Sequence, residues 1–163
     1  MISSIKNISL FCALSVLLLL PTDKFAATTS LTANAEVVAS LSVIQTTALD
    51  FGTFALINSA TTGTRVTNGA DTNIDEMVAV TAGLVTLAGG PNLLVNISVG
   101  NASLTDTGGN GGTAMTATLS VPSATVTLDG TGAGTSTVNG SLAVGALQTV
   151  STYSGTATVT VNY

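Results

Sequence analysis

Carboxylates gather in one short part of the chain. Asp71, Asp75 and Glu76 lie within six residues, with Asn68 and Asn73 beside them. Carboxylate and amide oxygens are the ligands that hard cations such as Ca²⁺ prefer, but the ligand spacing of an EF-hand loop is absent. Two interpretations stay open: a calcium site at these three acids and a solvated acidic loop. The sequence favours the second.

Nucleophilic catalysis lacks its usual partners. The chain has no His, and its one Cys, Cys12, lies close to the N-terminus. Ser and Thr are abundant, but they need a base to be activated. Asp50-Phe51-Gly52 spells a kinase metal-binding triplet without the other kinase motifs, so we interpret Phe51 as a core residue and Gly52 as a bend. A paired-carboxylate glycosidase is disfavoured because Trp is absent and Tyr is scarce. We therefore predict no enzyme activity and no cofactor.

The first 27 residues are typical of a signal peptide. Lys6 precedes an apolar run of 13 residues, 8–20, which Pro21 ends. Such a run is too short to span a membrane. We predict residues 1–27 to be removed during secretion through the periplasm, which leaves about 136 residues without Cys, a size suited to one domain.

Charge is sparse in the predicted mature chain. Arg65 is its one cation, against seven carboxylates. Nucleic-acid binding needs a basic surface, which this composition excludes. A polybasic membrane-binding patch is excluded for the same reason.

The elements that position these residues are predicted to be strands. Apolar and polar residues alternate at both ends of the predicted mature chain, in residues 27–43 and again in residues 153–163. Alternation places one row of side chains on one face of an extended strand. Between these ends, runs rich in Val and Thr are separated by turns rich in Gly and Asn. We expect such strands at residues 49–57, 76–82, 83–89, 93–99, 115–121, 124–129 and 136–144.

The stretch between residues 58 and 75 is polar and predicted to be a loop. Turns at intervals of roughly 8–12 residues are typical of an all-β sandwich. The sequence therefore predicts an antiparallel β-sandwich of seven to nine strands, with no helix after the leader.

Three segments together carry a family resemblance. They are LDFGTF at residues 49–54, VTLAGGPNLLVNISVG at 85–100 and GSLAVGALQTVSTYSGTATVTVNY at 140–163. In this order they resemble bacterial secreted proteins of the domain-of-unknown-function 4402 family, which is similar in turn to the pilins of chaperone–usher fimbriae. The resemblance implies an immunoglobulin-like fold that lacks its last strand and polymerises by donor-strand exchange.

The resemblance also implies where the subunits meet. Residues 28–36 would be a donor-strand arm, and residues 37–163 would be the pilin-type domain. The donor residues would be Leu31, Ala33, Ala35 and Val37. The edge strand of the acceptor groove would carry Ala157, Val159, Val161 and Tyr163.

The implied partners are identical subunits in a filament at the cell surface, with a periplasmic chaperone and an outer-membrane usher. An added strand of this kind gains affinity from main-chain hydrogen bonds and register from its alternate side chains. The alternative is that residues 28–44 form the first strand of a complete, monomeric sandwich. That module would bind or adhere to a ligand through loops such as residues 58–75.

Overall fold

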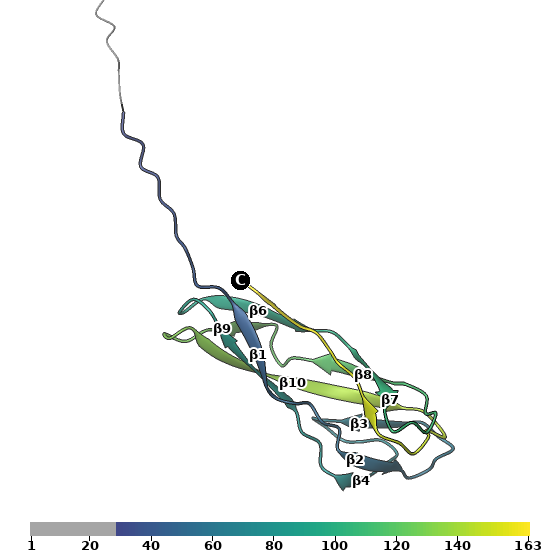
Figure 1. Ribbon diagram of the computed structural model, residues 1–163. Coiled ribbons are helices and arrows are strands. Elements are labelled where there is room, and N and C mark those ends of the chain that lie inside the picture. The colour runs from purple at the N-terminus through teal and green to yellow at the C-terminus, as the bar shows by residue number, and fades with distance from the viewer. Residues whose placement is uncertain (1–28) are drawn as a thin grey trace, which may run out of the picture. The chain divides into compact units, whose positions relative to one another are not determined.

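The computed structural model describes residues 29–163, and the compact folded unit spans Glu36–Tyr163 (Figure 1). Within this range the chain forms twelve strands and no helix. The strands are β1 Ser42–Thr47, β2 Thr53–Leu56, β3 Gly63–Val66, β4 Ile74–Val78, β5 Gly83–Ala88, β6 Leu94–Val99, β7 Ala102–Asp106, β8 Met115–Ser120, β9 Thr125–Thr127, β10 Ala133–Val144, β11 Tyr153–Ser154 and β12 Val159–Asn162. The predicted antiparallel β-sandwich is confirmed, whereas the predicted strand count was too low. The predicted signal peptide lies outside the described residues.

The long strand β10 organises the sandwich. Its first half pairs with β5, and its second half pairs with β8 on one side and β3 on the other. The larger sheet continues from β8 through β7 to β11, and a second sheet has the order β12-β6-β9. Because β11 pairs with β7 and β12 pairs with β6, the C-terminal segment runs alongside the β6–β7 segment through both sheets.

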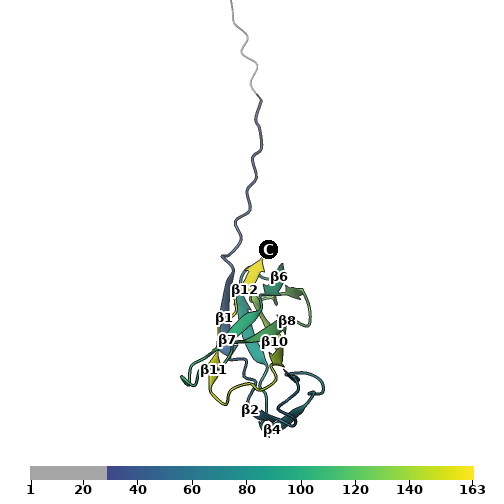
Figure 2. The same cartoon turned by 90° about the vertical axis from the view of Figure 1, so that its right-hand side faces the viewer.

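The larger sheet curls, but its two edge strands, β1 and β11, do not pair with each other. Among the described strands, β1 pairs only with β5, β11 only with β7 and β12 only with β6. The outer edges of β1 and of the C-terminal segment therefore both lack a partner strand, and they lie on the same side of the sandwich (Figures 1 and 2). Unpaired backbone groups along such edges are ready to bond to an added strand.

In the central strands, the apolar positions predicted by alternation form the core. Val95 and Ile97 of β6 are buried, as are Met115 and Ala117 of β8. Three neighbouring clusters fill the sandwich, centred on Phe51 and Leu142, on Val85 and Val138, and on Leu87, Val95 and Leu128. The two-residue period was therefore a sufficient guide to the inward face of the central strands.

Two strands were not predicted. β3 lies inside the segment expected to be a polar loop, and β7 follows β6 after a break at Gly100 and Asn101. Each is short and has few large apolar residues, so its hydrophobic pattern is weak. β3 forms because it completes the edge of β10, a long-range pairing that no local pattern reveals.

The alternating N-terminal stretch forms a strand only at its end. Only Ser42–Thr47 pairs with β5, whereas residues 29–40 form no strand and their side chains are exposed. Alternating side chains specify a face, but a strand also needs a partner for its backbone groups. The described residues offer residues 29–40 no such partner.

Candidate functional site

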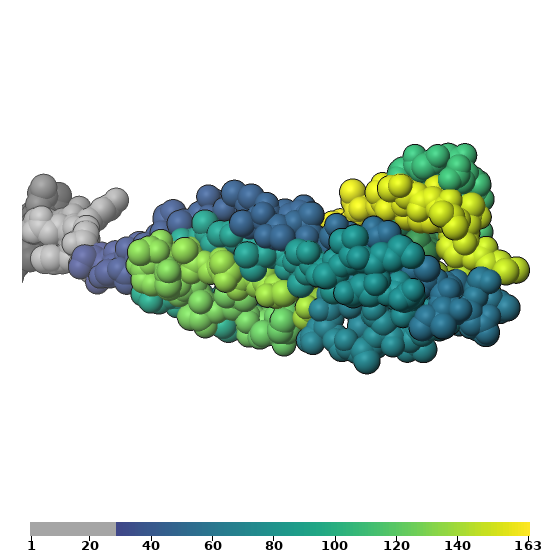
Figure 3. Space-filling model, turned by 90° about the horizontal axis from the view of Figure 1, so that it is seen from below, coloured from purple at the N-terminus to yellow at the C-terminus, as the bar shows by residue number. Residues whose placement is uncertain are grey.

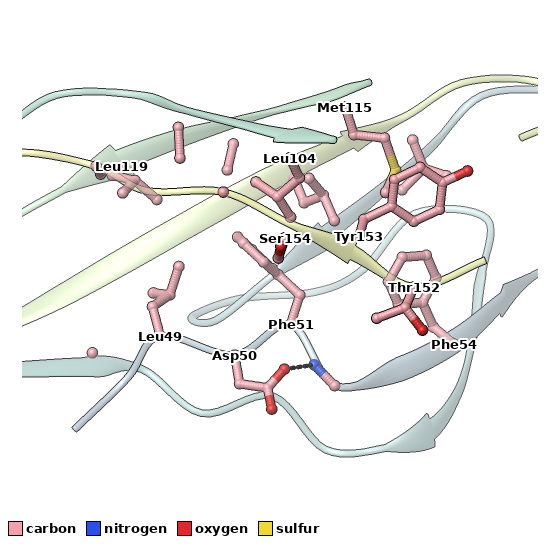
Figure 4. A pocket seen from close by; sticks show the side chains of 18 of the residues that line it. Leu49, Asp50, Phe51, Phe54, Leu104, Met115, Leu119, Thr152, Tyr153 and Ser154 are labelled. Atoms are coloured by element: carbon pink, nitrogen blue, oxygen red, sulfur yellow. Dashed lines mark hydrogen bonds between the residues drawn. The ribbon is translucent and has the colours of Figure 1, made fainter. Parts of the chain in front are cut away.

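An apolar groove of about 1100 Å³ opens along the unclosed side of the sandwich. One wall consists of residues from the stretch 43–56, and the other consists of residues from the stretch 148–159. Leu104, Met115 and Ala117 line it from β7 and β8, so the groove reaches the Phe51 core cluster (Figure 4). The groove is therefore a gap in the hydrophobic core rather than a polar pocket.

A tight bend after Leu49 shapes the first wall. Asp50 and Thr81 exchange backbone hydrogen bonds of 2.8 and 2.7 Å, and the Asp50 carboxylate accepts the Gly52 N–H at 2.8 Å (Figure 4). Gly52 has a φ of 68°, and a Cβ there would lie 2.1 Å from the Val78 carbonyl oxygen. Only glycine fits this bend, which turns Phe51 into the core. The kinase-like triplet is thus a structural element.

Tyr153 and Gln148 build the second wall. The Tyr153 hydroxyl donates to the Thr149 carbonyl at 2.7 Å and accepts from Gln148 Nε2 at 2.8 Å. Gln148 also donates to the Thr113 carbonyl at 2.6 Å, which ties this wall to the loop before β8. The wall is held by hydrogen bonds although most of its length has no partner strand on the groove side.

Asp106, at the end of β7, secures the same wall. Its carboxylate accepts the N–H groups of Gly108, Gly109 and Gly112 at 2.9, 3.1 and 2.8 Å, and it also accepts the Ser151 hydroxyl. The hydrogen bond from Ser151, followed by that from Gly112, lowers the Asp106 pKa from 3.8 to about 2. One charged group therefore orders a glycine-rich turn and fixes it to the groove wall.

Asp106→Asn should make the protein less stable at pH 7 and change its response to acid. The folded-state pKa lies below the unfolded value, so the stabilisation is complete above about pH 4 and is lost as pH falls through about 2. Urea unfolding at pH 7, 4 and 2 should show a smaller stability loss on acidification in the variant than in the parent. Asp75→Asn is the matched control for the loss of one negative charge. An unchanged acid response in Asp106→Asn would contradict this prediction.

Arg65 on β3 anchors the far end of the first wall. Its side chain is completely buried, and it donates to the carbonyls of Phe51 and Val78 at 3.0 Å each. The guanidinium also pairs with Asp71 and with Glu76, the latter at 2.6 Å. A single cation thus joins the groove wall, β4 and the loop before it.

This arrangement revises the interpretation of the acidic cluster. Asp71 and Glu76 face Arg65, so the predicted solvated loop is in part an internal ion-pair network. In residues 29–163 no group of three or more His, Cys, Asp or Glu side chains is arranged to hold a metal ion. Sequence reasoning missed Arg65 as a structural residue. The sequence did hold a signal for this ion pairing. Arg65 is the one Lys or Arg after residue 27, and it lies close in sequence to Asp71 and Glu76.

The predicted donor residues lie outside any strand. Leu31 is 92% exposed and Val37 is 95% exposed, and Ala33 and Ala35 are exposed as well. The apolar face of this segment is therefore open to solvent in the single chain.

The predicted acceptor residues divide into two groups. Ala157 and Val159 line the groove, whereas Val161 lies outside the groove lining and packs against the Leu87 cluster. Tyr163 lies away from the groove lining. Its hydroxyl accepts the Gly90 N–H at 2.7 Å and donates to the Ala39 carbonyl at 2.9 Å.

Comparison with known proteins gives one match. A family model described as Domain of unknown function (DUF4402) matches residues 41–163, in agreement with the resemblance seen in the sequence. No curated protein and no solved structure matches the chain. Within residues 29–163 no helix is long and apolar enough to cross a membrane.

Proposed function

This chain belongs to the DUF4402 family, and from that premise we propose that it is a structural subunit of an extracellular, fimbria-like filament. In this proposal the N-terminal arm of one subunit fills the open groove of the next as a donor strand. The observation that carries it is the groove itself, a core gap of about 1100 Å³ between two unpaired strand edges.

The lining of the groove suits an added apolar strand. This lining includes Leu49, Phe54 and Leu104, half-buried side chains that pack against the Phe51 core cluster. Water in contact with such side chains is unfavourable, so filling the groove with an apolar strand would stabilise the subunit. Main-chain bonds to both open edges would supply affinity, as in other strand-addition complexes.

The arm has the matching pattern. Residues 29–40 are exposed, residues 30–37 alternate between polar and apolar side chains, and twelve extended residues span about 40 Å. The wall at residues 148–159 has the same number of residues. Leu31 and Val37 would provide the large contacts, and Ala33 and Ala35 would fit where the groove is shallow.

Chain direction favours a neighbour as the acceptor. β1 begins at the end of the sandwich where the C-terminus lies and runs toward the end where β2 and β4 lie (Figure 1). The groove reaches that second end, since Thr53 to Leu56 of β2 line it. An arm that entered the neighbour's groove from that opposite end would run parallel to β1 and antiparallel to β12. Such head-to-tail contacts use two different surfaces and generate an open filament.

Export to the surface would require protection of the groove. An isolated subunit with an open apolar groove and unpaired edges is prone to aggregation. We therefore include a periplasmic chaperone and an outer-membrane usher in the proposal, together with export by the predicted signal peptide.

Removal of residues 28–35 tests the proposal. The full chain should form filaments and oligomers that survive SDS without boiling, and the shortened chain should form neither. A synthetic peptide of residues 28–41 should bind the shortened chain and raise its thermal midpoint by several degrees, because occupation of a site in the native state stabilises it. The control peptide carries Asp in place of Leu31 and Val37.

The opposite outcome would support the monomeric binding module. In that case the full and shortened chains would both elute as monomers, and neither peptide would change the thermal midpoint.

A further inference from the structure

We infer that subunits of the proposed filament also make a direct end-to-end contact through an apolar patch beside the mouth of the groove. This inference rests on the proposed function. The patch, here called the tip patch, consists of Ile57, Leu147 and Val150. Its occupant is the Tyr163 end of a second copy of this chain.

The tip patch is unusually exposed for its composition. Ile57, Leu147 and Val150 are 71%, 76% and 91% exposed. They come from two neighbouring loops, since the Leu147 N–H donates to the Ser59 carbonyl at 2.7 Å. Figure 3 shows these two loops, in blue and yellow, at one end of the folded unit. Ser59 and Val150 also line the groove, so the tip patch is continuous with the proposed donor-strand site.

Leu147 combines an exposed side chain with an unusual backbone conformation. Its φ is 55°, in the left-handed region that residues with large side chains seldom occupy. Residues kept in such conformations are concentrated at functional sites. Here the loop places a leucine in solvent rather than over the adjacent core.

The short link between arm and domain identifies the occupant. Val37 is the last proposed donor residue, and the Ala39 carbonyl is bound by Tyr163 on the domain itself. Two residue steps span at most about 7 Å. With Val37 in the mouth of the groove, the Tyr163 end of the donating subunit must therefore lie against the tip of the accepting subunit.

Charge supports this pairing of ends. The tip loops, residues 57–62 and 145–150, contain no charged residue, and neither does the loop at residues 89–94 near Tyr163. Val38, half-exposed beside the link, would face the tip patch. The contact would bury apolar surface on both subunits.

The expected consequence is a stiff filament rather than a string of freely jointed domains. Two variants separate this contact from arm binding. The first, Ile57→Asn with Leu147→Asn, removes the two apolar side chains of the tip patch that do not line the groove, and Asn adopts the left-handed conformation of residue 147 more readily than Leu. The second inserts Gly-Ser-Gly-Ser between Val37 and Val38 and so lengthens the link.

Filaments of the full-length chain would be imaged by electron microscopy, and their persistence length would be measured beside the SDS-resistant ladder. Both variants should keep the ladder and lose persistence length at least threefold. Ile44→Thr, which removes an exposed apolar side chain on β1, is the matched control and should behave like the parent.

Two results would overturn the inference and can be told apart. An unchanged persistence length in both variants would exclude the end-to-end contact and leave the donor-strand proposal intact. Absence of filaments and ladder in the parent would exclude both.

Discussion

Leu31→Asp should abolish filament formation and the SDS-resistant ladder. In the proposed complex Leu31 is buried in the neighbour's groove, and its burial contributes about 1.5–3 kcal/mol. Placing a carboxylate there costs several kcal/mol more, because the groove lining provides no cation to pair with it. The two effects together should weaken the contact between subunits by at least about a thousandfold. Unboiled gel electrophoresis and electron microscopy would measure the loss.

Thr32→Asp is the matched control for this experiment. It adds the same charge one residue along the arm, on the face that alternation directs away from the groove. Assembly should persist in this variant. Equal behaviour of the two variants, whether both assemble or neither does, would remove Leu31 from the proposed interface.

Arg65→Met should lower the free energy of unfolding by about 3–5 kcal/mol, the range measured when one partner of a buried ion pair is removed. Arg65 has no exposed surface, and its loss leaves the Phe51 and Val78 carbonyls without a side-chain donor and the Asp71 carboxylate with only the Val66 N–H. Urea unfolding at pH 7 would measure the change.

Glu76→Gln separates the buried interaction from the exposed one. The Glu76 side chain is 50% exposed, so its removal should cost no more than about 1 kcal/mol. A loss below 1 kcal/mol in Arg65→Met would show that the first groove wall does not depend on the buried cation.

The predictions for Leu31→Asp and Arg65→Met concern the same groove, the first through its proposed occupant and the second through its wall. Arg65 acts on the shape of one wall through the Phe51 carbonyl, whereas Leu31 would act as part of the occupant. A protein with Arg65→Met that still folds should therefore bind the arm peptide less tightly. The control Glu76→Gln should bind the peptide as the parent does.

Local patterns in the sequence determined the all-β class and much of the core. Alternation identified the buried faces of β6 and β8, including Val95, Ile97, Met115 and Ala117. It did so because a strand with one face in a core repeats its environment every two residues. The segment LDFG was likewise interpreted correctly as a core aromatic followed by a bend, since glycine adopts conformations that other residues avoid.

Other features depended on residues far apart in the chain. β3 exists because it pairs with β10. Asp71 and Glu76 form ion pairs with Arg65. The Asp106 carboxylate accepts a hydrogen bond from Ser151, 45 residues later in the chain. The groove is the clearest case, because it results from edges of β1 and β12 that no strand joins. A sequence pattern states which side chains prefer to be buried, but only the tertiary arrangement decides which backbone edges remain unpaired, since pairing depends on the position of every other strand.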